Sequence, residues 1–128
     1  MANPNIVSVS SIYGECVGWN LTATTTTTLF TVAADKLIKI NRIVCANVDT
    51  AAAADLTLSI TTNVQTSSGG TVAGGATTVF LAKTISVPAD SSLVVSDTPI
   101  YLRESDILKA TATSANRLHV ITSYLEIT

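Results

Sequence analysis

The chain has 128 residues, of which 12 % are charged and 47 % are hydrophobic, and its formal net charge is −2. This length suits one domain with a single core, and the few scattered lysines and arginines give no basic field for nucleic acid. No apolar run approaches the roughly 20 residues of a membrane span, so no membrane partner is expected. Because charge keeps exposed surfaces from associating, so low a charged fraction indicates a subunit of an assembly.

Residues 1–20 are expected to form an extended N-terminal arm or the first strand. Ile6–Tyr13 has strand character, and Gly14 and Gly18 loosen the chain after it. Trp19, the only tryptophan, suits a core or lid residue, and its indole N–H also suits an interface anchor. The first residues lack the basic and apolar regions of a secretory signal, which predicts a protein made and kept in the cytoplasm, soluble or assembled there.

Five consecutive threonines, residues 24–28, fit a strand or a loop edge that exposes hydroxyls. An ice-binding surface would need a spaced, repeated threonine array, and none is present in the sequence. Leu29–Val32 is then predicted to be a short strand, and Ala33–Lys36 the turn after it.

The next two runs are the strongest strand signals of the chain. In Leu37–Val48, alternate positions share one face, with Arg42 as the exception; these positions are Ile38, Ile40, Val44, Ala46 and Val48. In Leu56–Ile60, the aliphatic residues alternate with Thr57 and Ser59, as in a half-buried strand. The connection between the two runs is too long for a two-residue hairpin, so we expect either a broad turn or a crossing between two sheets.

Residues 62–78 are rich in glycine, serine and threonine and predict a protruding loop. It carries neither a Walker A motif nor a dinucleotide-binding fingerprint. Further strands are predicted at 79–87, 92–96, 100–102, 107–112 and 118–128, with turns at 88–91, 97–99, 103–106 and 114–116. This spacing predicts an all-β fold, a single antiparallel, jelly-roll-like β-sandwich of about eight strands.

The last predicted strand is apolar on both faces. Leu118, Val120 and Tyr124 share one face, whereas the other carries His119, Ile121, Leu125 and Ile127. Such a strand is either central in a two-sided core or covered on one face by another subunit.

No constellation for catalysis, cofactor binding or metal binding stands out, so we expect no enzyme, no cofactor and no metal. His119 is the only histidine, and no serine lies in a nucleophile elbow, so a structural or interface histidine is favoured. Cys45 is expected to be a small buried hydrophobe, although a Cys16–Cys45 disulfide remains open. Two acidic pairs could serve calcium or acid–base chemistry, but turn chemistry explains them better: Asp49 with Asp55, and Glu104 with Asp106.

The order of these segments resembles the small virion structural proteins of tailed bacteriophages, especially those of cyanobacterial and marine phages. The resemblance covers nearly the whole chain and lies in packing and turn motifs: 2–7, 43–48, 56–60, 85–95, 98–102 and 123–127. Members of this group are expected to have Gly-Asp in a turn where this chain has Ser105-Asp106.

The resemblance implies a capsid decoration or cement subunit that stabilises the virion head by protein–protein contacts. Its implied partners are the major capsid protein, other virion proteins and further copies of itself, with a trimer favoured, and its implied location is the virion. A neck, tail or fibre component is the alternative within the class, and a carbohydrate-binding host-attachment module is the alternative from another class. The residues predicted for the interface are Ile6, Val7, Tyr13, Trp19 and Tyr124.

Overall fold

The computed structural model of the chain describes residues 7–63, 65–67, 70–72 and 77–128. All regular structure in these ranges is β-strand, and the strands are β1 (Ile12–Asn20), β2 (Thr27–Thr31), β3 (Leu37–Asn47), β4 (Ala54–Thr62), β5 (Gln65–Ser67), β6 (Gly70–Val72), β7 (Thr77–Val87), β8 (Ser92–Ser96), β9 (Ile100–Leu102), β10 (Ile107–Ala112) and β11 (Leu118–Ile127).

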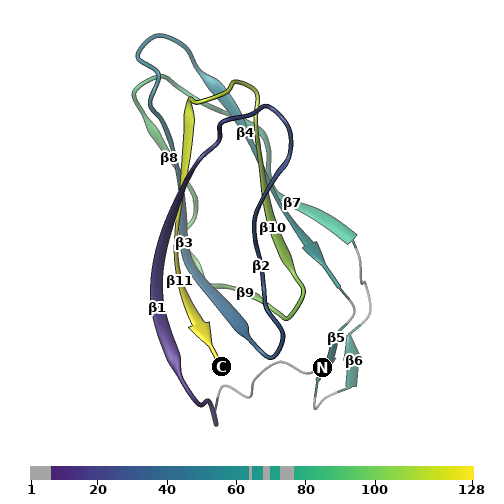
Figure 1. The fold of residues 1–128 in the computed structure, drawn as a ribbon. Helices are drawn as coiled ribbons and strands as arrows, with labels where there is room; N and C mark the ends of the chain where they lie inside the picture. Colours follow the sequence, from purple (N-terminus) through teal and green to yellow (C-terminus); the bar gives the residue numbers. More distant parts are fainter. Residues whose placement is uncertain (1–6, 64, 68–69, 73–76) are drawn as a thin grey trace.

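Nine of these strands form two antiparallel sheets that face each other across one core (Figure 1). The first, called the β3 sheet here, has the order β1-β11-β3-β8, with β9 also paired to β3. The second, the β4 sheet, has the order β2-β10-β4-β7, and β5 pairs with β6 in a separate two-stranded ribbon. The expected all-β, antiparallel β-sandwich is confirmed. The two sheets have nine strands rather than about eight, because β8 and β9 both pair with β3, on either side of the turn at 97–99.

The strands change sheets repeatedly along the chain. The connection from β3 to β4 crosses from one sheet to the other, which decides between the two possibilities left open for residues 49–53. The predicted loop at 62–78 lies partly outside the described residues. Within its described part, Thr62 ends β4, the segments 65–67 and 70–72 pair with each other, and Thr77 begins β7.

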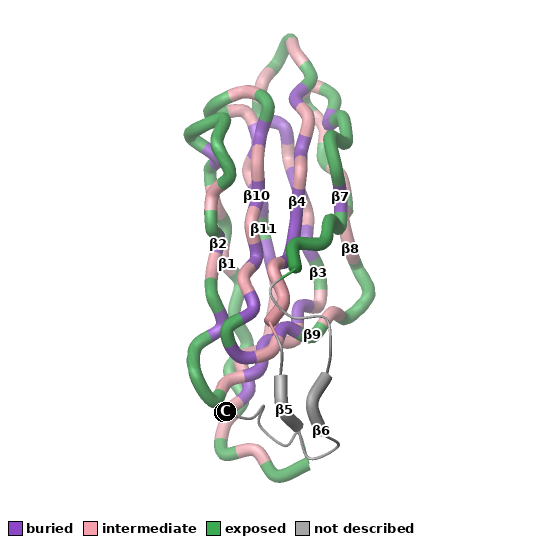
Figure 2. The backbone as a smooth tube through the Cα atoms, turned by 90° about the vertical axis from the view of Figure 1, so that its right-hand side faces the viewer, coloured by how far each residue is buried: buried purple, intermediate pink, exposed green. Residues whose placement is uncertain are grey.

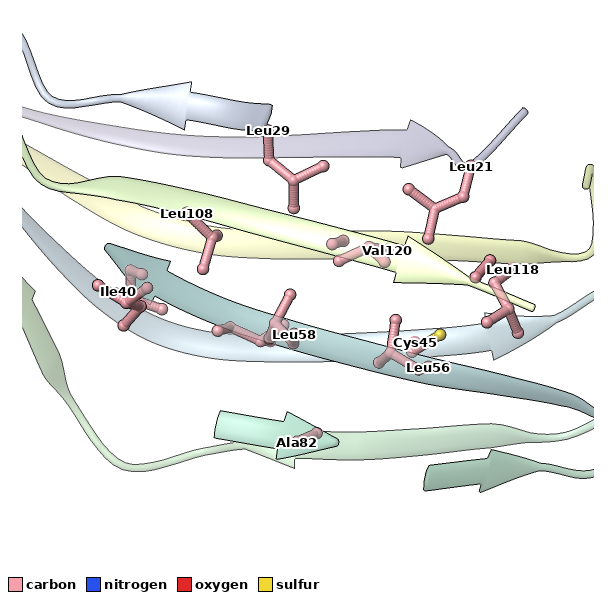
Figure 3. Packing of buried hydrophobic residues seen from close by; sticks show 14 of the residues in the cluster. Leu21, Leu29, Ile40, Cys45, Leu56, Leu58, Ala82, Leu108, Leu118 and Val120 are labelled. Carbon is pink, nitrogen blue, oxygen red and sulfur yellow. The ribbon is translucent and has the colours of Figure 1, made fainter. Parts of the chain in front are cut away.

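Side chains from both sheets interdigitate between the layers (Figure 3). In β4, Leu56, Leu58 and Ile60 are buried, as their alternation predicts, and Leu108 of β10 lies beside them in the same cluster. The β3 sheet contributes Leu118 and Val120 from β11, and both are completely buried. Figure 2 shows burial concentrated on β3, β4, β10 and β11, whereas β7 is mostly exposed. The core therefore lies between the inner strands of the two sheets.

The residues that point into the core from β3 agree with the predicted alternation only in the first half of the strand. Ile38 and Ile40 are buried, but beyond Arg42 the buried residues are Ile43, Cys45 and Asn47, while Val44 and Ala46 lie half-buried on the other face and Val48 is exposed. The cause is a β-bulge: Ser123 of β11 pairs with Arg42 and Tyr124 with Ile40, so that Asn41 is an extra residue. One extra residue moves every subsequent side chain to the opposite face.

Four predicted turns each contain one residue in the left-handed region. Asp35, Asp90 and Asn116 have φ values of 59°, 54° and 61°, which Asp and Asn adopt more readily than other side chains. Ser105 has a φ of 68° in the turn where the resemblance led us to expect glycine. The chain thus keeps the turn with a residue less suited to its backbone conformation.

The first strand begins later than the sequence predicts. Rather than Ile6–Tyr13, the strand is Ile12–Asn20, and it runs through both Gly14 and Gly18 in unbroken register with β11. Just before it, the backbone N–H groups of Ser10 and Ser11 donate to the carbonyl oxygen of Thr128. Residues 12–20 are therefore part of this chain's own β3 sheet.

Candidate assembly surfaces

Of the four acidic residues considered for calcium or acid–base chemistry, Asp49, Glu104 and Asp106 lie outside the strands, in connections, whereas Asp55 lies in β4 rather than in the predicted turn. Asp49 Oδ1 accepts hydrogen bonds from the backbone N–H groups of Ala51 and Ala52, at 2.7 and 2.9 Å, and its Oδ2 lies 3.0 Å from Nε of Arg117. These hydrogen bonds, with the charge of Arg117, hold the pKa of Asp49 below its ordinary value. At Asp55 the bonds are those of the backbone: its N–H donates to Thr113 Oγ1 at 2.8 Å, and its carbonyl oxygen accepts from the N–H of Thr113 at 3.1 Å.

Glu104 and Asp106 are both buried, and each accepts a backbone hydrogen bond. Asp106 accepts from the N–H of Arg103 at 2.9 Å and from that of Asn63 at 3.2 Å. Glu104 Oε2 accepts from the N–H of Asp35 at 2.8 Å. These bonds fasten the turn at 103–106 to its neighbours, as turn chemistry predicts. Within the described ranges, no group of three or more His, Cys, Asp or Glu side chains could hold a metal ion.

The two cysteines are free thiols in opposite environments. Cys16 is exposed on β1, and Cys45 is completely buried in the core, so the Cys16–Cys45 disulfide that the sequence left open is not formed. Burial raises the pKa of the Cys45 thiol to about 11, as expected of a small buried hydrophobe. His119 is half-buried on β11, between Asn20 of β1 and Ala46 of β3.

Two of the residues predicted for an interface meet in an aromatic cluster. The ring of Phe30 lies 6.2 Å from that of Trp19 and 5.6 Å from that of Tyr124, measured between centroids. All three are partly buried against the core, so the cluster joins β1 and β11 of one sheet to β2 of the other. Burial, followed by the carboxylates of Glu15 and Glu126, raises the pKa of Tyr124. Sequence reasoning missed Phe30, whose position across the sandwich depends on the pairing of β2 with β10.

The other predicted interface residues lie elsewhere. Tyr13, 58 % exposed, is near the start of β1, opposite Glu126 of β11. Val7 is 91 % exposed, and Ile6 lies outside the described residues. The five predicted residues therefore do not form one patch.

An apolar row crosses the outer face of the β3 sheet. Gly18 pairs with Ile121, Ile121 with Val44, and Val44 with Val94, so these four positions share one face of the sheet. Ile121 and Val94 are 44 % and 43 % exposed, and a Cβ atom at Gly18 would lie 3.7 Å from Cγ1 of Ile121. Glycine at this position therefore leaves Ile121 uncovered.

A second row on the same face has mixed character. It runs through Gly14, Leu125, Lys39 and Tyr101, and Tyr101 is 48 % exposed. We call the two rows together the apolar outer face: Gly14, Gly18, Lys39, Val44, Val94, Tyr101, Ile121 and Leu125. The sequence indicated this face through the second apolar side of 118–128, but could not show which residues of β3 and β8 extend it.

The outer face of the β4 sheet is rich in hydroxyl groups instead. Thr26 and Thr111 share a hydrogen bond of 2.9 Å between their side chains, and so do Thr61 and Thr78. These threonines come from segments that lie far apart in the sequence. Hydroxyl groups of this kind remain well hydrated at a surface, so this part of the β4 sheet is more polar than the apolar row on the β3 sheet.

Strand β7, at one edge of the β4 sheet, also exposes apolar side chains. Val79, Phe80 and Ile85 are 48 %, 51 % and 41 % exposed, and Nζ of Lys83 lies 4.9 Å from the centroid of the Phe80 ring. The register with β4 shifts twice, and Thr84 has a φ of 52°. Bulges and a lysine are features that hinder further strand pairing at an edge.

A shallow depression of about 510 Å³ lies where β3 ends. It is lined by Ala46, Asn47, Val48, Asp90, Ser91 and Ser92. Both polar ends of the Asn47 amide already bond to the backbone of the chain itself.

No helix that could cross a membrane is present in the described part of the chain.

No protein-family model matches the chain, and no curated protein matches it. Among solved structures it is similar to a chain from the disulfide-linked pili of Bacillus endospore appendages, with a TM-score of 0.47 and 17 % identity over 92 % of this chain and 87 % of that one. It is also similar to VP2 in the subviral particle of infectious bursal disease virus, with a TM-score of 0.43 and 17 % identity over 94 % of this chain and 33 % of VP2. These similarities concern the β-rich fold and identify neither a family nor a function.

Proposed function

We propose that the chain is a virion structural subunit of the capsid decoration type, which binds the major capsid protein and further copies of itself. The observation that carries the proposal is the apolar outer face of the β3 sheet, because Ile121 on the inner strand β11 and Val94 on the edge strand β8 are both exposed in one row across the sheet. An apolar surface across several strands marks an interaction site more often than scattered exposed residues do. The sequence resemblance to phage virion proteins supplies the kind of assembly.

The composition of the two outer faces supports an orientation on the shell. The apolar outer face would bind the shell, where burial contributes about 25 cal/mol per Å² of apolar area removed from water. The threonine-rich face of the β4 sheet, with its Thr26–Thr111 and Thr61–Thr78 pairs, would face solvent. The low charged fraction of 12 % suits a surface that neighbours cover. Alternation of strands between the sheets is also the connectivity of a jelly-roll-like sandwich.

The arrangement does not favour the carbohydrate-binding alternative. A sugar platform normally requires exposed aromatic rings that lie together, and Trp19 is partly buried against Phe30 and the core. The exposed rings of Tyr13, Phe80 and Tyr101 lie on β1, β7 and β9, and no two of these strands are paired with each other. A neck, tail or fibre component uses the same kind of contact, and the binding experiment separates it from a head protein.

The proposal is tested by mixing the purified protein with undecorated heads and with tails of the phage that encodes it. We expect co-sedimentation with heads, and loss of this binding in Ile121→Lys, which places a charge in the apolar outer face. Thr31→Lys, at an exposed position of β2 in the other sheet, is the matched control and should bind as the wild type does. Binding only to tails would support the neck or tail alternative, and equal head binding by both variants would refute the role of this face.

A further inference from the structure

Among the described residues, strand β1 pairs with β11 alone, so no other strand lies along its outer edge. At both ends of the pairing with β11, odd-numbered residues make the ladder bonds: the N–H of Leu21 donates to Leu118 O, and that of Thr128 donates to Ser11 O. Because hydrogen-bonded and non-hydrogen-bonded pairs alternate in an antiparallel ladder, the backbone groups of even-numbered residues point away from β11. The outward groups therefore belong to Ile12, Gly14, Cys16, Gly18 and Asn20.

Among the outer strands of the two sheets, β1 is the long and regular one. It has nine residues in unshifted register with β11 and contains no proline. At the other edges, β2, β8 and β9 have five, five and three residues, and β7 is interrupted by its two register shifts. Natural sheets protect exposed edges by shortening, bulging or charging them. Strand β1 is neither short nor bulged, and Glu15 is its one charged residue.

We propose that β1 pairs antiparallel with β1 of a second copy across a two-fold axis at Cys16, which joins the two β3 sheets into one continuous sheet. Cys16 is the midpoint of Ile12–Asn20, so this register pairs the strand over its full length. Every outward residue then meets an outward residue of the other copy, which gives about ten backbone hydrogen bonds. The strand is thus self-complementary, as a two-fold interface requires.

The side chains fit this register as well. Gly14 lies opposite Gly18 of the second copy, and Glu15 lies opposite its Val17, so no two charges face each other. A register centred on Glu15 would instead place two like charges directly opposite, which is destabilising. Tyr13 lies opposite the second copy's Trp19, and the pair extends the Trp19–Phe30–Tyr124 cluster across the new contact. The contact also covers Tyr13, which is 58 % exposed in the single chain.

A two-fold contact produces a dimer and does not fit inside a closed trimer, the oligomer that the sequence resemblance favoured. The inference specifies how two copies associate, and the head binding in the proposed function does not depend on it. A monomer that binds heads would remove this contact and keep the head-binding part of the proposed function. A dimer that ignores heads would do the reverse.

Cysteine cross-linking tests the register. Residues opposite each other in a hydrogen-bonded pair have Cα atoms about 5.5 Å apart, within the range of about 4.4–6.8 Å that a disulfide spans. Mild oxidation should therefore link wild-type chains through Cys16, whereas Cys16→Ser should give no linked dimer because Cys45 is buried.

Two further variants distinguish this pairing from random contact between exposed thiols. Both carry Cys16→Ser, with Gly14→Cys in one and Gly18→Cys in the other. Cβ atoms at these positions would have their nearest contacts at 3.9 and 3.7 Å, so both substitutions fit. Neither variant should cross-link alone. In a dimer of one variant, the introduced cysteines of the two copies would lie four residues, or about 14 Å, apart along the paired strands. The mixture should cross-link, and equal linking in all samples would overturn the register.

The contact is also tested without cross-links by sedimentation equilibrium. Cys16→Ser should remain a dimer, while Cys16→Pro should be a monomer with an unchanged circular dichroism spectrum. Proline at this position removes an outward N–H and leaves the bonds to β11, as edge strands tolerate. A wild-type monomer, or a folded Cys16→Pro dimer, would refute the pairing.

Discussion

Asn47 is predicted to be the polar side chain on which the end of the sandwich at the β3–β4 connection depends most. It is 2 % exposed, and its Nδ2 donates to the carbonyl oxygens of Ala52 and Val87, at 3.0 and 2.9 Å. Its Oδ1 accepts from the backbone N–H of Asp49 at 2.9 Å. One side chain therefore connects β3, the loop that leaves it, and the end of β7.

Replacing this side chain by Asn47→Ala removes three hydrogen bonds. At about 1 kcal/mol net for each bond, with a further cost where a buried carbonyl loses its partner, we expect a loss of about 3–4 kcal/mol in the free energy of unfolding. Asn47→Asp keeps the acceptor for Asp49 but places a carboxylate against two carbonyl oxygens. It should be at least as destabilising at neutral pH and should recover in part on acidification, when the protonated group can donate one bond.

Urea unfolding followed by circular dichroism measures both variants against Asn41→Ala, at the half-buried bulge position of β3. The m-value should stay the same, so the loss should appear in the transition midpoint. An Asn47→Ala protein within about 0.5 kcal/mol of the wild type would refute the assignment, because it would place the substitution among ordinary surface changes.

Three further substitutions test other buried, strained or charged groups. Among the described residues, Thr122 Oγ1 is buried without a hydrogen-bond partner, so Thr122→Val should stabilise the fold by about 1 kcal/mol, and a lower urea midpoint would contradict this. Ser105, at a φ of 68°, should gain about 0.5–1 kcal/mol on Ser105→Gly, as measured by thermal unfolding; a loss would show that its side chain matters more than its backbone. The lowered pKa of Asp49 contributes stability that is present above its unfolded-state pKa of about 3.9 and is lost as pH falls through the folded value. The urea midpoint of Asp49→Asn should therefore depend less on pH below about pH 4 than that of the wild type. An unchanged pH dependence would contradict the assignment.

The local patterns of this sequence predicted the fold class, because alternation and turn chemistry act over a few residues. Leu56, Leu58 and Ile60 are buried as alternation predicts. In the predicted turn at 33–36, Asp35 adopts the left-handed backbone conformation that Asp and Asn tolerate better than other residues with side chains. The face of β3 beyond Arg42 was predicted wrongly, because the bulge at Asn41 depends on pairing with β11, which lies far along the chain. Alternation alone cannot show an inserted residue.

The candidate surfaces were less predictable for the same reason. The sequence indicated that one face of 118–128 needs a cover, but the apolar outer face includes Val44 and Val94, which only strand order brings beside Ile121. A truncation starting at Gly18, intended to remove the predicted N-terminal arm, would delete most of β1 and uncover β11. A truncation starting at Ser10 keeps the strand and the bond from Ser10 to Thr128, and so tests the preceding residues alone.

The assembly role is tested by the mass of the purified protein in solution, followed by its sedimentation with undecorated heads. We expect a dimer that co-sediments with heads at saturable occupancy and loses this binding in Ile121→Lys. A monomer at every concentration that leaves heads unbound would contradict both proposals, since neither the apolar outer face nor the β1 edge would then have a partner.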